Sequence, residues 1–150
     1  MKLKTVEQIL DFAIEKEQDA SDFYTGLAQK MKKQHMKKVF EGFAKEEQGH
    51  KKKLQNVKAG KYAMPAKQKV QNLKIGDHLV EVELKADIEF QDALILAMKA
   101  EKAAFKLYHE LAEACDDDKA KKLFMSLAQE EAKHKLRFEI EYDDYTYSEN

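Results

Sequence analysis

Along four stretches of the chain, apolar residues recur at every third or fourth position, which is the spacing of one face of an α-helix. The first stretch follows Thr5 and Gln8, whose Thr-x-x-Gln spacing is a capping box and predicts the start of a helix. Its apolar face continues to Met31. The second stretch covers residues 39–57 and ends near Gly60. Both stretches therefore predict long amphipathic helices.

The second half of the chain has the same pattern. A third apolar face covers residues 93–112, and a fourth covers residues 123–138. The aspartates at 116–118 separate these two faces, because Asp favours helix caps over helix interiors. Residues 60–85 contain a proline, a glycine and mixed polarity, so we predict a long connection there.

A shift of 84 residues, without a gap, superimposes the first half of the sequence on the second. Between residues 9 and 54 this shift produces 15 identities in 46 pairs, and the identities gather on the apolar faces. Tyr24 matches Tyr108, and the segment "AKEEQGHK" matches "AQEEAKHK". The pattern predicts two copies of one helical hairpin.

The length of the middle connection favours one arrangement of the hairpins. Helices of about 25 residues are about 38 Å long, and a connection of about 25 residues extends up to about 80 Å. It can cross the whole bundle, which disfavours a plain up-down bundle with short loops. Five Gly and one Pro in 150 residues also favour long helices. We predict an all-α, ferritin-like four-helix bundle in which residues 1–150 form a single domain.

Charge and cysteine content exclude several classes of function. Lys and Arg total 27 against 28 acidic residues, so no net charge attracts nucleic acid or an anionic membrane. We interpret the run Lys51–Lys53 as a solvated helix face. Cys115 is the only cysteine, which excludes an internal disulfide and a cysteine-based metal site. A free thiol and the lack of a signal peptide or membrane-spanning stretch lead us to expect a cytoplasmic protein.

Six polar residues interrupt the apolar faces at matching positions of the repeat. They are Glu17, Glu47, His50, Glu101, Glu131 and His134. A twofold arrangement of the hairpins gathers them in one layer, where unpaired buried carboxylates repel one another strongly. Four ionised glutamates carry four negative charges, which two divalent cations balance. The pattern therefore predicts a site for two metal ions.

The donor types narrow the choice of metal. Glu and His three residues apart lie one turn apart on the same helix face. One Glu from each of two helices and a Glu-x-x-His pair from each of two others form the ligand set of di-iron and di-manganese bundles. Oxygen-rich donors with two imidazoles favour iron or manganese, and zinc stays open. A single Glu-x-x-His pair is usually solvated, so the repetition on two apolar faces is what favours a metal site.

Neighbouring residues permit two interpretations. Glu46 and Glu130 also repeat, but one position off the apolar face, so we interpret them as residues that flank or support the metal ligands, with a solvated surface position favoured. For Tyr24 and Tyr108, a hydrogen bond to a ligand carboxylate and a role as core filler fit equally well. Cys115 fits a small buried hydrophobe. The remaining histidines have no partner in the repeat and are expected on the surface: His35, His78 and His109.

Over nearly its whole length the sequence resembles the rubrerythrin-like branch of the ferritin-like superfamily. The resemblance implies a carboxylate-bridged di-iron site with the six residues above as ligands, in which Glu47 and Glu131 are the bridging, catalytic carboxylates. Typical rubrerythrins carry a rubredoxin domain with Cys-x-x-Cys pairs. This sequence has none, so the resemblance implies a separate electron-donor protein such as a rubredoxin. Typical members also have a glutamate where this chain has Ala104.

The resemblance implies an oxidoreductase, a di-iron peroxidase that reduces hydrogen peroxide or dioxygen and protects against oxidative stress. A ferroxidase that stores or handles iron is the alternative, and a sensor or interaction module with a structural metal is a third hypothesis. We also expect a homodimer. The aromatic residues of the tail "YDDYTYSEN", placed beyond the fourth helix, either pack on a partner subunit or fray.

Overall fold

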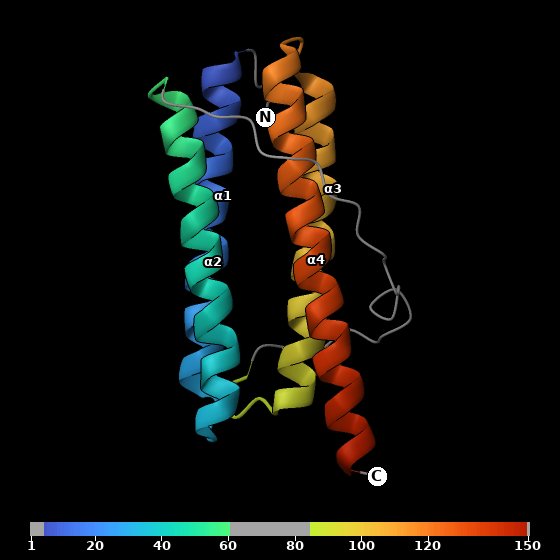
Figure 1. The fold of residues 1–150 in the computed structure, drawn as a ribbon. Helices are drawn as coiled ribbons and strands as arrows, with labels where there is room; N and C mark the ends of the chain where they lie inside the picture. The colour runs from blue at the N-terminus through green and yellow to red at the C-terminus, as the bar shows by residue number, and fades with distance from the viewer. Residues whose placement is uncertain (1–4, 61–84, 150) are drawn as a thin grey trace.

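The computed structural model describes residues 5–60 and 85–149, and these residues form four α-helices and no strand (Figure 1). The helices are α1 (Val6–Lys30), α2 (Gln34–Lys58), α3 (Phe90–Ala114) and α4 (Asp118–Glu149). The predicted all-α, ferritin-like four-helix bundle is confirmed. Most of the connection predicted between the second and third helices lies outside the described residues.

Local backbone chemistry explains three of the predicted helix ends. Before α1, Thr5 Oγ1 accepts the backbone N–H of Gln8 at 3.1 Å, and Gln8 Oε1 accepts the backbone N–H of Thr5 at 3.2 Å. The predicted capping box is therefore present. After α2, Gly60 has a φ of 77°, a left-handed conformation that costs glycine little. Before α4, Asp117 Oδ1 accepts the backbone N–H of Lys119 at 2.9 Å.

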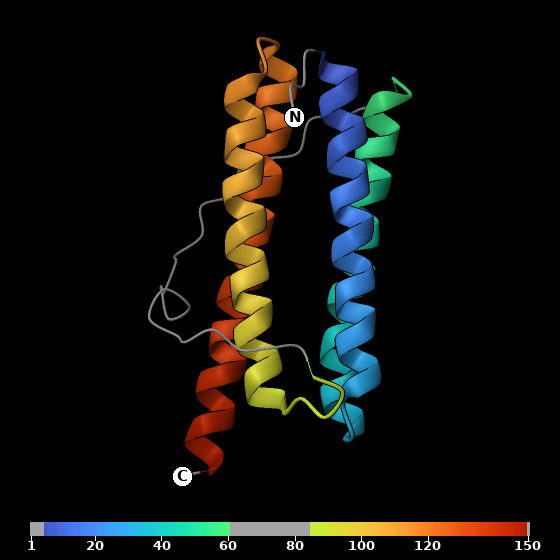
Figure 2. The same cartoon turned by 180° about the vertical axis from the view of Figure 1, so that it is seen from behind.

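The helices pair as two hairpins, α1 with α2 and α3 with α4, which stand side by side (Figures 1 and 2). The start of α3 lies at the end of the bundle opposite to the end of α2, as a crossover between them requires. Within the first hairpin, Ser21 Oγ donates to the carbonyl oxygen of Ala44 at 3.0 Å. The two halves of the sequence repeat thus fold as two matching hairpins.

Two apolar clusters fill the bundle, and each combines residues of both hairpins. One includes Tyr24 of α1 and Phe138 of α4, and the other includes Ala13 of α1 and Phe124 of α4. On α1, Glu17 lies between Ala13 and Tyr24, so the predicted polar layer is enclosed between the two clusters. Apolar packing on both sides keeps bulk water out of this layer.

The last helix extends further than predicted. Residues 142–149, which we expected beyond the fourth helix, continue α4. The hydroxyl of Tyr142 accepts a hydrogen bond from Gln91 Nε2 at 3.3 Å, and the ring of Tyr145 packs edge-on against Phe90, with 5.3 Å between the ring centroids. The expectation that these residues lie beyond the fourth helix is wrong, because the two tyrosines lie three residues apart on one helix face and pack against the start of α3.

The lysine run that we interpreted as a solvated helix face lies on the outside of the bundle. Lys52 is exposed, and Lys51 Nζ donates to Gln18 Oε1 at 2.7 Å, so the lysine run lies on the outside of the first hairpin. Within the described part of the chain, no helix is both long enough and apolar enough to span a lipid bilayer.

Candidate metal centre

The six polar residues predicted from the repeat meet in the layer between the apolar clusters. Their exposed fractions range only from 0% for Glu131 to 7% for His50. Charged side chains buried to this extent require a partner of opposite charge or a cation. The six residues are Glu17 on α1, Glu47 and His50 on α2, Glu101 on α3, and Glu131 and His134 on α4.

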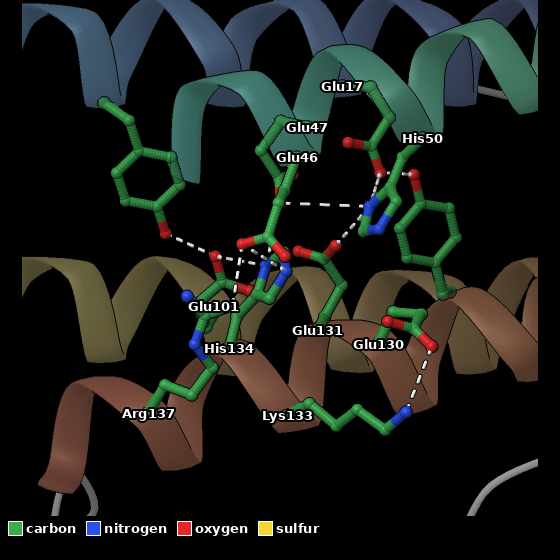
Figure 3. Close-up of polar contacts among 12 residues, drawn as sticks. Glu17, Glu46, Glu47, His50, Glu101, Glu130, Glu131, Lys133, His134 and Arg137 are labelled. Carbon is green, nitrogen blue, oxygen red and sulfur yellow. Dashed lines mark hydrogen bonds and ion pairs between the residues drawn. The ribbon is translucent and has the colours of Figure 1, made fainter. Parts of the chain in front are cut away.

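The two Glu-x-x-His pairs face each other across the two hairpins (Figure 3). His50 Nδ1 lies 2.9 Å from Glu131 Oε1, and His134 Nδ1 lies 2.9 Å from Glu47 Oε1. The two imidazole rings are nearly parallel, with 6° between their planes and 5.4 Å between their centroids. The two Glu-x-x-His pairs, which match in the sequence repeat, are therefore also related in the structure by an approximate twofold axis.

The six side chains divide into two groups of four potential ligands. One group is Glu17, Glu47, His50 and Glu131, and the other is Glu47, Glu101, Glu131 and His134. Within each group, one ligand atom from every residue lies within 4.8 Å of the others. Glu47 and Glu131 belong to both groups, which is the place that bridging carboxylates would have.

Most atoms that face the centre of this layer make no hydrogen bond. His134 Nδ1 and Glu47 Oε1 lie 2.9 Å apart as an ion pair, yet neither atom makes a well-oriented hydrogen bond. Unsatisfied buried polar atoms are rare in folded proteins. Cations placed among these lone pairs would satisfy them, so the donor set fits two divalent metals. The unsatisfied atoms are Glu17 Oε2, Glu47 Oε1, His50 Nδ1, Glu101 Oε2, both carboxylate oxygens of Glu131, and His134 Nδ1.

Without metal, the layer retains protons. Burial and the neighbouring carboxylates raise the pKa of Glu47 to about 9 and raise the pKa of Glu131 well above its usual range. Burial opposes protonation of His134, but its contacts with Glu101 and Glu47 raise its pKa to about 10. Protons thus supply part of the positive charge that the cluster needs, and metal cations would replace them.

Each of the two buried tyrosines bonds a glutamate of the opposite hairpin. The hydroxyl of Tyr24 donates to Glu101 Oε1, and the hydroxyl of Tyr108 donates to Glu17 Oε1. Both rings are 1% exposed and belong to the apolar clusters. Each tyrosine therefore fills the core and also hydrogen-bonds a carboxylate of the cluster, which were the two roles considered from the sequence. Burial, reinforced by the nearby carboxylates, raises the pKa of both phenols well above the usual range. The hydroxyls therefore keep the protons that they donate.

Glu46 is exposed, as predicted for a solvated side chain, and it also contacts a residue of the cluster, as predicted for a residue that supports the candidate ligands. Its Oε2 lies 2.7 Å from Arg137 Nη1 and 3.6 Å from His134 Nε2, although 44% of the side chain is exposed (Figure 3). Its repeat mate Glu130 instead pairs with Lys133 at 3.3 Å. The sequence contained no signal for Arg137, because its contact with Glu46 crosses between the hairpins.

The other residues considered from the sequence lie away from the cluster or add no ligand. His35 is exposed, and His109 is half-buried on α3. His78 lies outside the described residues. Cys115 is buried in an apolar cluster, as expected of a small hydrophobe. Ala104, half-buried one turn after the α3 glutamate, offers no donor atom at that position.

Comparison with known proteins agrees with the fold. The rubrerythrin family model matches residues 8–142. No curated protein matches the chain. Among solved structures, a hypothetical protein from Pyrococcus furiosus is similar, with 28% sequence identity and a TM-score of 0.64, over 93% of this chain and 89% of that chain. Because the family match spans far more than half of the sequence and includes all six residues of the cluster, the chain belongs to the rubrerythrin family.

Proposed function

We propose that the chain is a di-iron carboxylate oxidoreductase that reduces hydrogen peroxide or dioxygen and so protects against oxidative stress. The observation that carries the proposal is the pair of ligand groups that share Glu47 and Glu131. Cations that share carboxylates can act together on one substrate. Membership of the rubrerythrin family supports iron as the metal, while the donor types also accept manganese or zinc.

When bound, two ferrous ions supply one electron each, which suffices for a two-electron cleavage of an O–O bond. The chain's own residues prepare the site for this chemistry. Glu47 and Glu131, which belong to both ligand groups, would be shared between the two ions, and Glu17 and Glu101 would each hold one ion. The tyrosine hydroxyls hold Glu17 and Glu101 in position, and the apolar clusters exclude bulk water around them.

Reduction of one molecule of hydrogen peroxide to two molecules of water consumes two electrons and two protons. We propose that a separate electron-donor protein, such as a rubredoxin, restores the reduced site after each turnover. We also propose that the chain acts as a cytoplasmic homodimer. Without the donor, each reduced chain should react with one molecule of peroxide and then stop.

The test begins with metal analysis of anaerobically purified protein, followed by stopped-flow mixing of the reduced protein with peroxide or with dioxygen. We expect two iron ions per chain, and oxidation that consumes one peroxide per two irons. The double variant E47A/E131A should lose metal loading, because both ligand groups contain these residues. The control variant E41A/E113A removes two exposed glutamates and should retain it.

Three outcomes would contradict parts of the proposal. Two iron ions per chain in E47A/E131A would reject the bridging assignment. A reduced site that reacts with neither oxidant would reject the oxidoreductase and favour a structural metal. Uptake of ferrous iron far beyond two ions per chain, together with a large spherical assembly in size-exclusion chromatography, would favour the ferroxidase and storage alternative.

A further inference from the structure

The two histidines of the cluster differ in the contacts of Nε2, the ring nitrogen on the side away from the cluster. On one side, Glu46 Oε2 lies 3.6 Å from His134 Nε2, the ring nitrogen that faces away from the cluster (Figure 3). Glu46 belongs to α2 and His134 to α4, so this contact also joins the two hairpins. The inner nitrogen of His134, Nδ1, faces Glu47 and Glu101 at 2.9 and 3.6 Å.

Arg137 fixes the position of Glu46. Its Nη1 donates to Glu46 Oε2 at 2.7 Å, and its guanidinium lies over the ring of Phe43, 4.4 Å from the ring centroid. Phe43 in turn meets His134 edge-on, with 5.1 Å between ring centroids and 84° between ring planes. Three residues thus hold His134 from outside the cluster, and they come from both hairpins.

In the part of the chain that the structure describes, the other half of the centre is built differently. Glu130, the repeat mate of Glu46, pairs with Lys133 of its own helix at 3.3 Å. Lys53 occupies the repeat position of Arg137, and Leu127 that of Phe43. Among the described residues, the ion pairs of His50 are all made by its inner nitrogen, Nδ1. Within residues 5–60 and 85–149, no carboxylate therefore pairs with the outer nitrogen of His50 as Glu46 does with that of His134.

We propose that Glu46 is a positioning residue for His134 and that it makes the two metal positions unequal, with tighter binding beside His134 than beside His50. The proposal rests on the two-metal centre of the proposed function. A neutral imidazole has one N–H, and it can bind a metal through Nδ1 only when that proton is on Nε2. The negative carboxylate of Glu46, 3.6 Å from Nε2, favours the tautomer that carries its proton on this nitrogen, and its position beside the ring restricts the rotation of the imidazole.

Titration with cobalt(II) against a competing chelator tests the proposal on the whole chain. Wild-type protein should bind two ions with different dissociation constants. E46A should weaken one of the constants by about 10- to 100-fold, the usual effect of losing the partner of a metal-bound histidine. E46Q retains an oxygen acceptor, so it should restore part of the loss. The matched control E130A, at the repeat position, should leave both constants unchanged.

A double-mutant cycle identifies which half of the centre Glu46 serves. E46A should retain its full effect when added to H50A, and should have no further effect when added to H134A. The thermal midpoint of the metal-free protein should change little in E46A, because the Glu46–Arg137 pair is exposed. A purely structural role would instead lower this midpoint and weaken both constants together.

The outcomes separate the failure of this inference from the failure of the proposed function. Wild-type protein that binds no cobalt(II), or only one ion, would reject the two-metal centre itself. Wild-type protein that binds two ions, with E46A and E130A giving equal changes or no change, would reject only the role of Glu46. An effect of E46A that persists in H134A and disappears in H50A would likewise reject the assignment to His134.

Discussion

The hydroxyl of Tyr108 on α3 donates a hydrogen bond to the carboxylate of Glu17 on α1, and so joins the two hairpins within the buried polar layer. The repeat produces the reciprocal contact, in which Tyr24 on α1 donates to Glu101 on α3. Each tyrosine thus orients a glutamate from the other half of the sequence. Glu17 and Glu101 therefore gain these hydrogen bonds only when the two hairpins dock.

Replacement of either tyrosine by phenylalanine should destabilise the metal-free protein. Y24F would leave Glu101 without its donor, and Y108F would do the same to Glu17. The loss of a buried hydrogen bond to a carboxylate should lower the free energy of unfolding by about 1–3 kcal/mol. Urea unfolding followed by circular dichroism measures this change.

Tyr142 supplies the matched control for these variants. Its hydroxyl accepts from Gln91 Nε2 at 3.3 Å in a solvent-exposed contact, so Y142F should change the free energy of unfolding by well under about 1 kcal/mol. Equal effects of Y142F, Y24F and Y108F would mean that the contacts between the hairpins have no special role in stability.

The stability of the metal-free protein should fall as the pH rises from 6 to 9. In this window the folded state keeps a proton on Glu47, whose pKa is about 9, whereas an unfolded glutamate with a pKa of 4.5 has lost it. The raised pKa values of Glu131 and His134 act in the same direction. Burial opposes ionisation of Glu17, but its contact with His50 lowers its pKa overall, so its opposite effect lies below pH 4.5.

Thermal melting of chelator-treated protein at pH 6, 7.5 and 9 measures this dependence. The double variant E47Q/E131Q should show a much flatter profile, because amides do not titrate. If wild type and E47Q/E131Q have the same profile, the buried carboxylates are not the source of the pH dependence.

Metal binding should stabilise the fold, because the ligands come from four helices and meet only in the folded chain. Ferrous iron or cobalt(II) at about 100 times its dissociation constant should add about 2.7 kcal/mol per site. Anaerobic thermal melting with and without the metal measures the shift. E131Q should reduce it, and E113Q, at an exposed position of α3, should not. An equal shift in wild type and E131Q would place the stabilising metal elsewhere.

The sequence was sufficient to predict the polar layer, because a helical repeat determines which residues share a face. Glu17 and Glu101 occupy the same place in the two copies, so a twofold arrangement of the copies brings them into one layer. Spacing along one helix does not determine contacts between helices. Tyr24 lies two turns beyond Glu17, yet it bonds Glu101 of the other hairpin.

The same limit explains why the sequence could not decide between a solvated position and a supporting contact to the candidate ligands for Glu46. Its position off the apolar face correctly predicts partial exposure, but its contacts with Arg137 and His134 depend on how α2 and α4 dock. The length of α4 was missed for a different reason. Residues 139–149 are mostly acidic or polar, so the apolar spacing is weak there. Tyr142 and Tyr145 continue the helix face.

The C-terminal part of α4 should stabilise the bundle through Tyr145 and not through Tyr147. The ring of Tyr145 is half-buried and packs edge-on against Phe90 at the start of α3, with 5.3 Å between ring centroids. Tyr147, two residues later, is 87% exposed. Y145A should therefore lower the free energy of unfolding by about 1–2 kcal/mol, whereas Y147A should leave it unchanged within about 0.5 kcal/mol. Urea unfolding of both variants tests this, and equal destabilisation would mean that the end of α4 does not pack on α3 in solution.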